Sequence, residues 1–279
     1  MKKVIINQKQ QNAKVVDGTK VVSLGAGQEY VCGTSELPNA YVAVVDTTIE
    51  SFTPQDTIRF RINDANFLID FGDGTGLHHH TTGTIEHQYD EGGEKTIKMY
   101  GYGSPLWYHS ASDRHKLKKV LSFGSGWINT FNSSFTLCTN LESLPMNEHK
   151  FCGYDMRQAF HTCPLSEYPI LNTSRVVTMG SAFMNSNFDD KKAKDWILIS
   201  CSDMNAFYGT YMSRSTTDAL LLGWLRWENG QPGIQLKENV PLHLGNTCYT
   251  LGGEVEEAFN YYVDVLNWTI TISWTENNN

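Results

Sequence analysis

The segment from Phe131 to Tyr211 repeats one short pattern about every 24 residues. Its four copies read FNSSFTLC (131–138), MRQAFHTC (156–163), MGSAFMNS (179–186) and the shorter MNAFYGTY (204–211). In the first three copies the apolar or small residues stand at i, i+4 and i+7, as in Phe131, Phe135 and Cys138. That spacing places them on one stripe of a short helix. The central residues of the four copies are Phe135, Phe160, Phe183 and Phe207.

A unit this small cannot bury its own apolar stripe, but stacked units cover one another. The repeat therefore predicts a solenoid, with the four phenylalanines lined up in adjacent layers. Each buried Phe or Met would contribute roughly 1.5–3 kcal/mol to the free energy of folding. Short apolar segments ending in proline follow the first two copies, at 141–145 and 165–169, and Trp196–Ile199 is a third candidate. The alternative is an ordinary helical core whose spacing is accidental.

Composition bounds the class of protein. The chain has 279 residues, of which 40% are hydrophobic and 19% charged, so it is long enough for two or three small folded domains. The net charge of −8 argues against a nucleic-acid partner, because phosphate binding needs clustered Lys and Arg. The only dense basic run is Arg114–Lys119, which we interpret as a solvated edge.

The cysteines indicate neither a metal site nor a disulfide framework. None of the six forms a C-x-x-C pair, and Cys138 and Cys163 hold equivalent repeat positions, which is typical of small core residues. The apolar run Val4–Ile6 is too short for a signal peptide, and no stretch approaches 18 apolar residues. We therefore expect neither export by such a signal nor insertion into a membrane.

Residues 51–103 alternate in the manner of half-buried strands. Apolar residues alternate with polar ones at 58–62 and again at 67–71, and Asn63–Asn66 is predicted to be the turn of a hairpin between them. Further strands are expected at 85–89 and 95–100, separated by a turn at 90–93. A small β-sandwich is the natural assembly.

This region resembles a PKD-type domain. The residues that carry the resemblance are IDFGDGT (69–75), then His87-Gln88-Tyr89, Gly93 and Ile97. The match covers roughly 50 residues and departs at Lys95, where the family often has an aromatic residue. The resemblance implies a β-sandwich that serves as a spacer or adhesion module and not as a catalyst.

The repeats resemble BspA-like leucine-rich repeats, through Met156, Phe160, Cys163 and Leu165 and again through Val176–Phe183. Leu117–Trp127 is a candidate lead-in strand. Asp218–Trp224 resembles a helix that closes such arrays, and a strand at Leu242–Leu244 is expected to follow it. The residues expected on one face of a second helix are Val255, Phe259, Tyr262, Val263 and Leu266. Trp268, Ile270, Ile272 and Trp274 alternate as a final strand, so this part would cap the solenoid.

Chemistry-bearing motifs are scarce. Asp70 and Asp73 fall short of a calcium loop and are read as Asx-type turn residues. His78–His80, with His87, could hold a metal, but an exposed polar loop is the favoured interpretation. Glu254, Glu256 and Glu257 suit the start of a helix, with a glycosidase pair as the alternative. No P-loop, nucleophile elbow or zinc-protease motif occurs, so we predict no catalytic residues, no cofactor and no metal.

Aromatic residues are the remaining resource for binding. Those beyond the core pattern are Trp107, Tyr108, Trp127, Tyr154, Tyr208, Tyr211, Trp224 and Trp227. Exposed aromatics can stack on sugar rings or anchor a protein partner, whereas buried ones would fill the core between modules.

The sequence thus predicts a multidomain α+β protein. Its ranges are a β-rich N-terminal arm or attachment segment (1–50), a PKD-like β-sandwich (51–103), a short BspA-like leucine-rich-repeat solenoid (104–213) and an α/β C-terminal cap (214–279). PKD-like and BspA-like modules together resemble bacteriophage virion and surface proteins. This implies a non-enzymatic tail-fibre, spike or head-fibre component, assembled in the host cytoplasm and carried on the virion.

In that hypothesis the N-terminal segment would contact other virion proteins, and the repeats would face a host receptor, with glycan as one candidate. The receptor, the copy number and homo-oligomer formation are left open by the sequence. Two other hypotheses remain, a bacterial cell-surface adhesin and a glycan-degrading enzyme.

Overall fold

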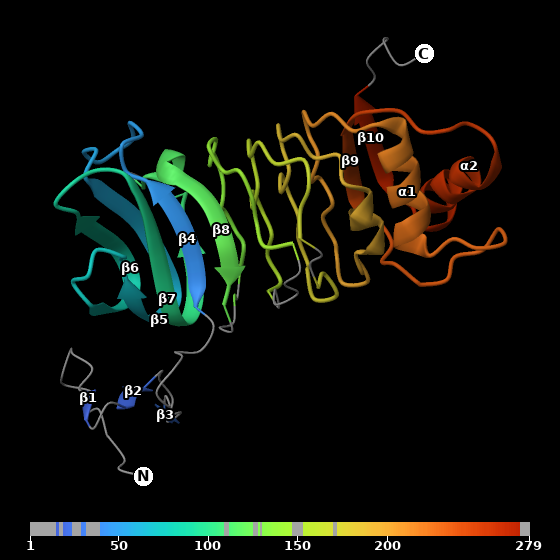
Figure 1. Ribbon diagram of the computed structural model, residues 1–279. Coiled ribbons are helices and arrows are strands. Elements are labelled where there is room, and N and C mark those ends of the chain that lie inside the picture. The colour runs from blue at the N-terminus through green and yellow to red at the C-terminus, as the bar shows by residue number, and fades with distance from the viewer. Residues whose placement is uncertain are drawn as a thin grey trace. The chain divides into compact units, whose positions relative to one another are not determined.

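The computed structural model describes residues 40–108, 112–124, 128, 130–146, 153–169 and 172–273, together with the backbone of three short N-terminal strands. Those strands are β1 (Val15–Val16), β2 (Thr19–Ser23) and β3 (Glu29–Val31), which pair antiparallel in the order β1-β2-β3. The fold is of the α+β kind, mostly β with few helices (Figure 1). The chain divides into two compact units, Met1–Ile128 with Ser143–Pro145, and Asn129–Glu142 with Met146–Asn279.

The first unit contains a five-stranded antiparallel sheet in the order β6-β5-β7-β4-β8. Its strands are β4 (Tyr41–Asp46), β5 (Thr57–Asp70), β6 (Leu77–Gln88), β7 (Glu94–Leu106) and β8 (Leu117–Phe123). β4 lies between β7 and β8 and pairs with both. The sheet therefore joins residues that the sequence analysis placed in the N-terminal segment, the sandwich and the repeat region.

The prediction of a turn at Asn63–Asn66 is wrong. β5 passes through these residues as one strand, and its register against both β6 and β7 shifts between Ile62 and Asn66. Asp64 takes a left-handed φ of 47°, so the strand bulges and bends there instead of reversing. The bend folds the β5–β6 hairpin over, and residues near its two ends meet: the rings of Phe71 and His87 lie 3.9 Å apart.

Two glycines of β7 make room for this bulge. A Cβ on Gly101 would lie 2.1 Å from the carbonyl oxygen of Asn66, and one on Gly103 would lie 2.5 Å from the Cβ of Ala65. Both distances are shorter than any van der Waals contact. The bulge in β5 therefore depends on the two glycines of β7 opposite it, and neither stretch of sequence predicts it alone.

Lys116 corrects the interpretation of Arg114–Lys119 as a solvated edge. Arg114–Lys116 forms a short 3₁₀ helix, η1, and Lys116 is fully buried. Its ammonium donates to the carbonyl oxygens of Thr53 (3.2 Å), Pro54 (2.7 Å) and Thr57 (2.8 Å). The buried carboxylate of Asp113 accepts from the backbone N–H of residues in the same loop, including Thr53. The pair fixes the loop before β5 to the segment that leads into β8.

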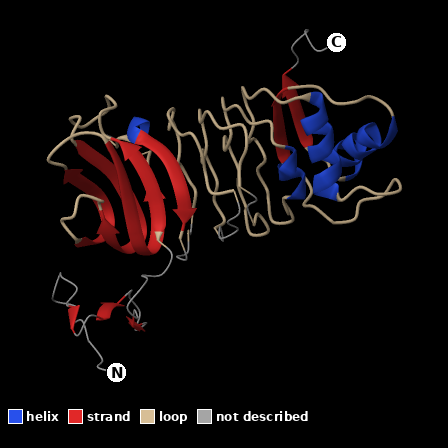
Figure 2. Ribbon diagram, viewed as in Figure 1, coloured by secondary structure: helices blue, strands red, loops and turns tan. Residues whose placement is uncertain are grey.

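The repeats of the second unit are not helical, which corrects the prediction of short helices. Phe131–Ser134 and Phe135–Cys138 are two successive β-turns, closed by N–H···O bonds of 2.9 and 3.1 Å. The third residue of each turn, Ser133 and Leu137, has φ 57°, a value that ends any helix. Two four-residue turns give the same i, i+4 spacing as one helix. Figure 2 accordingly draws these segments as side-by-side loops.

Successive repeats are joined by backbone hydrogen bonds. The N–H groups of Phe131, Ser133 and Phe135 donate to the carbonyls of Asp155, Arg157 and Ala159 in the next repeat, at 2.9–3.1 Å. The second repeat is bonded to the third in the same way, from Met156 to Thr178 and from Phe160 to Ala182. The backbone N–H groups of each segment thus donate to carbonyl groups of the next segment.

The four central phenylalanines lie in adjacent layers, as the spacing predicts. Phe135, Phe160, Phe183 and Phe207 stack with centroid separations of 5.4 Å at each step and interplanar angles of 6–16°. Cys138 and Cys163 are buried beside them, as expected of small core residues. Cys32 and Cys152 lie outside the described residues.

The ring stack continues into the C-terminal part. After the 3₁₀ helix η2 (Lys191–Asp195) come α1 (Arg214–Leu225), β9 (Pro241–Asn246), α2 (Gly253–Asn260), the π-helical turn η3 (Tyr261–Val265) and β10 (Thr269–Ser273). Phe207 stacks on Trp224 of α1 at 6.4 Å. The helix expected at 218–224 and the strands expected at 242–244 and from 268 are present, β9 and β10 pairing in parallel. Trp274 lies outside the described residues.

One part of the predicted apolar helix face is wrong. Tyr262 and Leu266 are buried, but Val263 is 37% exposed. The helix widens after Asn260, and the N–H of Leu266 bonds to the carbonyl of Tyr261, five residues back. This π-type turn rotates Val263 off the stripe. No helix in the described part of the chain is long and apolar enough to cross a membrane.

The phenylalanine stack gives a stability prediction. We expect Phe160→Ala to lower the free energy of unfolding by about 3–5 kcal/mol, because its ring is fully buried between two others. Tyr154→Ala, which removes an exposed ring in the same repeat, should change it by no more than about 0.5 kcal/mol. Urea denaturation followed by circular dichroism measures both, and equal losses would contradict the stack as the main core.

The buried lysine gives a second prediction. Lys116→Met should lower the free energy of unfolding by about 3–5 kcal/mol, since it leaves the Asp113 carboxylate and three carbonyls without their cation. Lys98→Met, on the exposed side of β7, is the matched control and should have little effect. Urea denaturation followed by tryptophan fluorescence, to which the buried Trp107 of this unit contributes, measures both variants. A loss below about 1 kcal/mol would show that the cation does not hold the loop.

Candidate functional site

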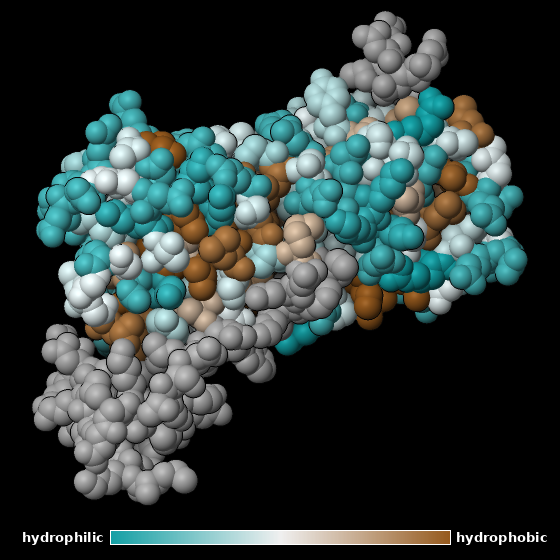
Figure 3. All heavy atoms as spheres, viewed as in Figure 1, coloured by the Kyte–Doolittle hydropathy of each residue, from teal (hydrophilic) through white to brown (hydrophobic). Residues whose placement is uncertain are grey.

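The aromatic residues singled out by sequence divide between core and surface. Trp107 and Trp224 are fully buried, and Tyr108 and Trp227 are half-buried. Tyr154, Tyr208 and Tyr211 are exposed, by 63%, 54% and 65%. Trp127 lies outside the described residues. Figure 3 shows hydrophobic and hydrophilic residues interspersed over the face that it draws.

Tyr208 and Tyr211 belong to the last copy of the repeat. The β-turn Phe207–Thr210 is closed by a 2.9 Å bond from the N–H of Thr210 to the carbonyl of Phe207. Gly209 has φ 70°, and the buried hydroxyl of Thr210 donates to the carbonyl of Phe183 in the previous copy. Tyr208 therefore lies within a short turn that is bonded to the previous copy, and Tyr211 follows this turn directly.

Two residues from elsewhere in the chain lie against Tyr208 and its turn. The imidazole of His243, on β9, lies 5.0 Å from the Tyr208 ring, at 69°. The backbone N–H of Asn185 bonds to the carbonyl of Tyr208 at 2.9 Å. The Asn185 amide lies over Gly209, where a Cβ would come within 2.0 Å of its Oδ1. We call Asn185, Tyr208, Tyr211 and His243 the tyrosine patch.

The tyrosine patch is uncharged and rich in free polar groups. Gly245 N–H donates to His243 Nδ1 at 3.0 Å, so the neutral ring carries its proton on Nε2. Burial lowers the pKa of His243, which keeps the ring neutral at pH 7. Within the described residues, nothing is hydrogen-bonded to His243 Nε2, the Asn185 amide or the two tyrosine hydroxyls. The patch thus offers donors, acceptors and aromatic faces together.

Tyr154 has a different setting. Arg157 forms an ion pair with Asp155 at 2.7 Å, and Asn132 donates to the same carboxylate at 2.9 Å. Burial opposes ionisation of Asp155, but the hydrogen bonds from Arg157 and Asn132 outweigh it and lower its pKa. The exposed ring of Tyr154 therefore stands beside charged groups, and no second exposed tyrosine flanks it in the described chain.

The three adjacent histidines lie in strand β6 and not in a polar loop, which corrects that interpretation. The strand alternation separates them: His78 and His80 lie near the ring of Phe71, at 5.4 and 6.1 Å, whereas His79 bonds to Asn66. His87, from the far end of the same strand, stacks on Phe71 and lies 5.8 Å from His78. Burial, and then the neighbouring imidazoles, lower the pKa of His80.

Asp70 and Asp73 act as turn residues, as predicted. Asp70 accepts from the N–H of Gly72 at 2.9 Å, and Asp73 accepts from the N–H and hydroxyl of Thr75 at 3.0 and 2.7 Å. Asp73 also pairs with His87 Nε2 at 2.6 Å. Among the described residues no group of three His, Cys, Asp or Glu side chains is placed to hold a metal ion.

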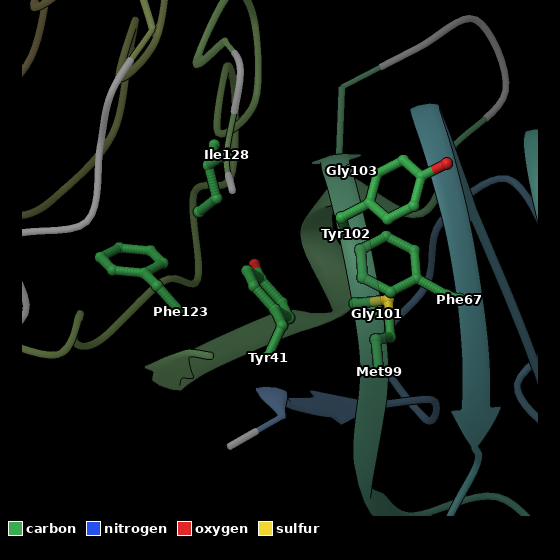
Figure 4. Close-up of a pocket in the computed structure, with 8 residues that line it drawn as sticks. All are labelled: Tyr41, Phe67, Met99, Gly101, Tyr102, Gly103, Phe123 and Ile128. Carbon is green, nitrogen blue, oxygen red and sulfur yellow. The ribbon is translucent and has the colours of Figure 1, made fainter. Parts of the chain in front are cut away.

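Other candidate groups have structural roles. Glu256, in the first turn of α2, accepts from the N–H of Gly252 at 2.7 Å, which suits a residue at a helix start. A hollow in the first unit, between Tyr41, Phe67, Met99 and Phe123, has a volume of about 10 Å³ (Figure 4). That is room for about one water molecule and far below the size of a ligand pocket.

Comparison of the chain with protein-family models, with curated proteins and with solved structures finds no match. The candidate site therefore depends on the geometry alone. Sequence reasoning identified Tyr208 and Tyr211 as possible binding aromatics but missed Asn185 and His243. The repeat register could have indicated Asn185, which holds the position equivalent to Gly209, whereas His243 lies in a strand that matches no repeat.

The Asp73–His87 pair predicts that the stability of the fold decreases at acid pH. Burial raises the pKa of Asp73, but hydrogen bonds from Thr75 and His87 outweigh it, so the folded pKa lies below the ordinary value of 3.8. A carboxylate whose pKa is lowered on folding stabilises the folded state at pH values above its unfolded pKa. This contribution is lost progressively as the pH falls from the unfolded pKa to the folded pKa. We expect Asp73→Asn to weaken the loss of stability between about pH 5 and pH 2, because in this range the carboxyl takes up a proton in the unfolded chain before it does so in the folded one.

Urea midpoints at a series of pH values measure this effect. Asp90→Asn is the control, because this exposed carboxylate accepts no hydrogen bond from any described residue. If the two variants follow the same pH dependence, Asp73 does not stabilise the turn through its charge.

Proposed function

We propose that this chain is a non-enzymatic structural protein of a bacteriophage virion, a tail-fibre, spike or head-fibre component that presents a recognition surface to the host. In this proposal residues 131–211 form a BspA-like leucine-rich-repeat solenoid, and the bent sheet of the first unit is a PKD-like sandwich. The observation that supports it best is the phenylalanine stack. Its hydrogen-bonded layers fix the backbone, while Tyr208 and Tyr211 remain exposed.

A rigid scaffold with exposed side chains at its turns suits binding better than turnover. Binding gains affinity when the contact residues are already ordered, because less conformational entropy is lost. Catalysis needs a positioned acid, base or nucleophile, and the carboxylates and histidines described above serve as turn, capping and stacking residues. In the proposal the N-terminal segment binds other virion proteins and the second unit faces the host.

Particle composition tests the proposal directly. We expect mass spectrometry of purified particles from a phage that encodes this chain to detect it at a fixed copy number. Antibodies raised against the second unit should slow adsorption to the host. Absence of the chain from particles would exclude the virion role. Its recovery from bacterial surfaces instead would favour an adhesin, and turnover of host polysaccharide by the purified protein would establish an enzyme.

A further inference from the structure

We propose that the tyrosine patch binds a neutral saccharide, with Tyr208 as the stacking platform. This inference deepens the proposed function by naming the chemical class of the receptor, and it concerns one set of residues: Asn185, Tyr208, Tyr211 and His243. The exposure, the charge and the unused hydrogen-bonding groups of these four side chains support it.

Tyr208 offers an exposed aromatic ring to a ligand. Its ring is 54% exposed, and the edge-on contact with His243 at 5.0 Å limits the ways in which it can turn. Its carbonyl accepts from Asn185 and its turn is closed at Thr210, so the backbone beneath the ring is fixed. An exposed, held aromatic face suits the C–H face of a pyranose, which is apolar and flat.

The patch also offers polar groups to which no described residue is hydrogen-bonded. A sugar hydroxyl both donates and accepts, so it is best met by side chains that do the same. The Asn185 amide can do both, His243 Nε2–H donates, and the hydroxyls of Tyr208 and Tyr211 can do either. These groups are contributed by two copies of the repeat and by β9, around a turn only four residues long.

Charge selects the class of sugar. None of the four side chains is charged at pH 7, since burial keeps His243 neutral. A carboxylated or phosphorylated glycan would leave its charge without a partner here, and losing hydration without compensation is costly. Tyr154, by contrast, lies next to the Arg157–Asp155 ion pair. The tyrosine patch therefore fits neutral hexoses and N-acetylhexosamines.

Saturation-transfer-difference NMR on the full-length chain tests the inference. The probes are neutral oligosaccharides of glucose, galactose, rhamnose and N-acetylglucosamine, with oligoglucuronate and phosphorylated glycans as charged counterparts. We expect at least one neutral probe to bind. Tyr208→Ala should weaken that binding at least 10-fold, and Asn185→Ala and Tyr211→Ala about 3- to 10-fold. Tyr154→Ala, the exposed tyrosine outside the patch, should leave it unchanged.

Circular dichroism and thermal unfolding establish that each variant is folded, and Tyr208→Phe, which keeps the ring, should retain most of the binding. No binding of any neutral probe, stronger binding of the charged probes, or an equal loss in Tyr154→Ala would each overturn the inference. The proposed function fails separately: a chain absent from particles that still binds neutral sugars through Tyr208 would refute the virion role alone. A particle protein whose sugar binding ignores Tyr208 would refute only the patch.

Discussion

Backbone hydrogen bonds between neighbouring repeats set the structure of the second unit. In a helix each N–H bonds within its own segment, four residues back. In segment 131–138 the residues Ser133 and Leu137 are left-handed. The N–H groups of Phe131, Ser133 and Phe135 bond to the next repeat instead. Neighbouring repeats therefore depend on one another. The same bonds set the spacing at which Phe135, Phe160 and the following rings stack.

This constraint explains which sequence-based predictions were correct. The 24-residue spacing correctly placed the four phenylalanines in adjacent layers, because a ladder of layers needs one buried ring at each level. The secondary structure was wrong, since two β-turns in succession repeat every four residues, close to the 3.6 of a helix. In the first two copies the residues with positive φ that distinguish these turns from a helix are Ser133, Leu137, Gln158 and Thr162, none of which is glycine. Their conformation is imposed by the bonds to the neighbouring layer.

The first unit shows a different limit of prediction from sequence. The alternation of residues 58–62 and 67–71 correctly indicated strands, but Asn63–Asn66 has the composition of a turn and forms a bulge. What decides between them is Gly101 and Gly103, which leave room for the bulge from a strand about 40 residues away. Lys116 was misread for the same reason: a basic run suggests a solvated edge, and the three carbonyls that hold this lysine are backbone groups that no side-chain pattern reveals.

The same ladder also separates structural from variable positions, which bears on recognition. In the last three copies the residue after the central phenylalanine, His161, Met184 or Tyr208, accepts a hydrogen bond through its carbonyl oxygen from the previous copy. Its backbone is thus required, whereas its side chain differs from copy to copy and is not fully buried in these three copies. A scaffold of this kind can change its surface chemistry without changing its core. The aromatic character of the last copy is then a property of its surface, because Phe207 beneath it already supplies the packing.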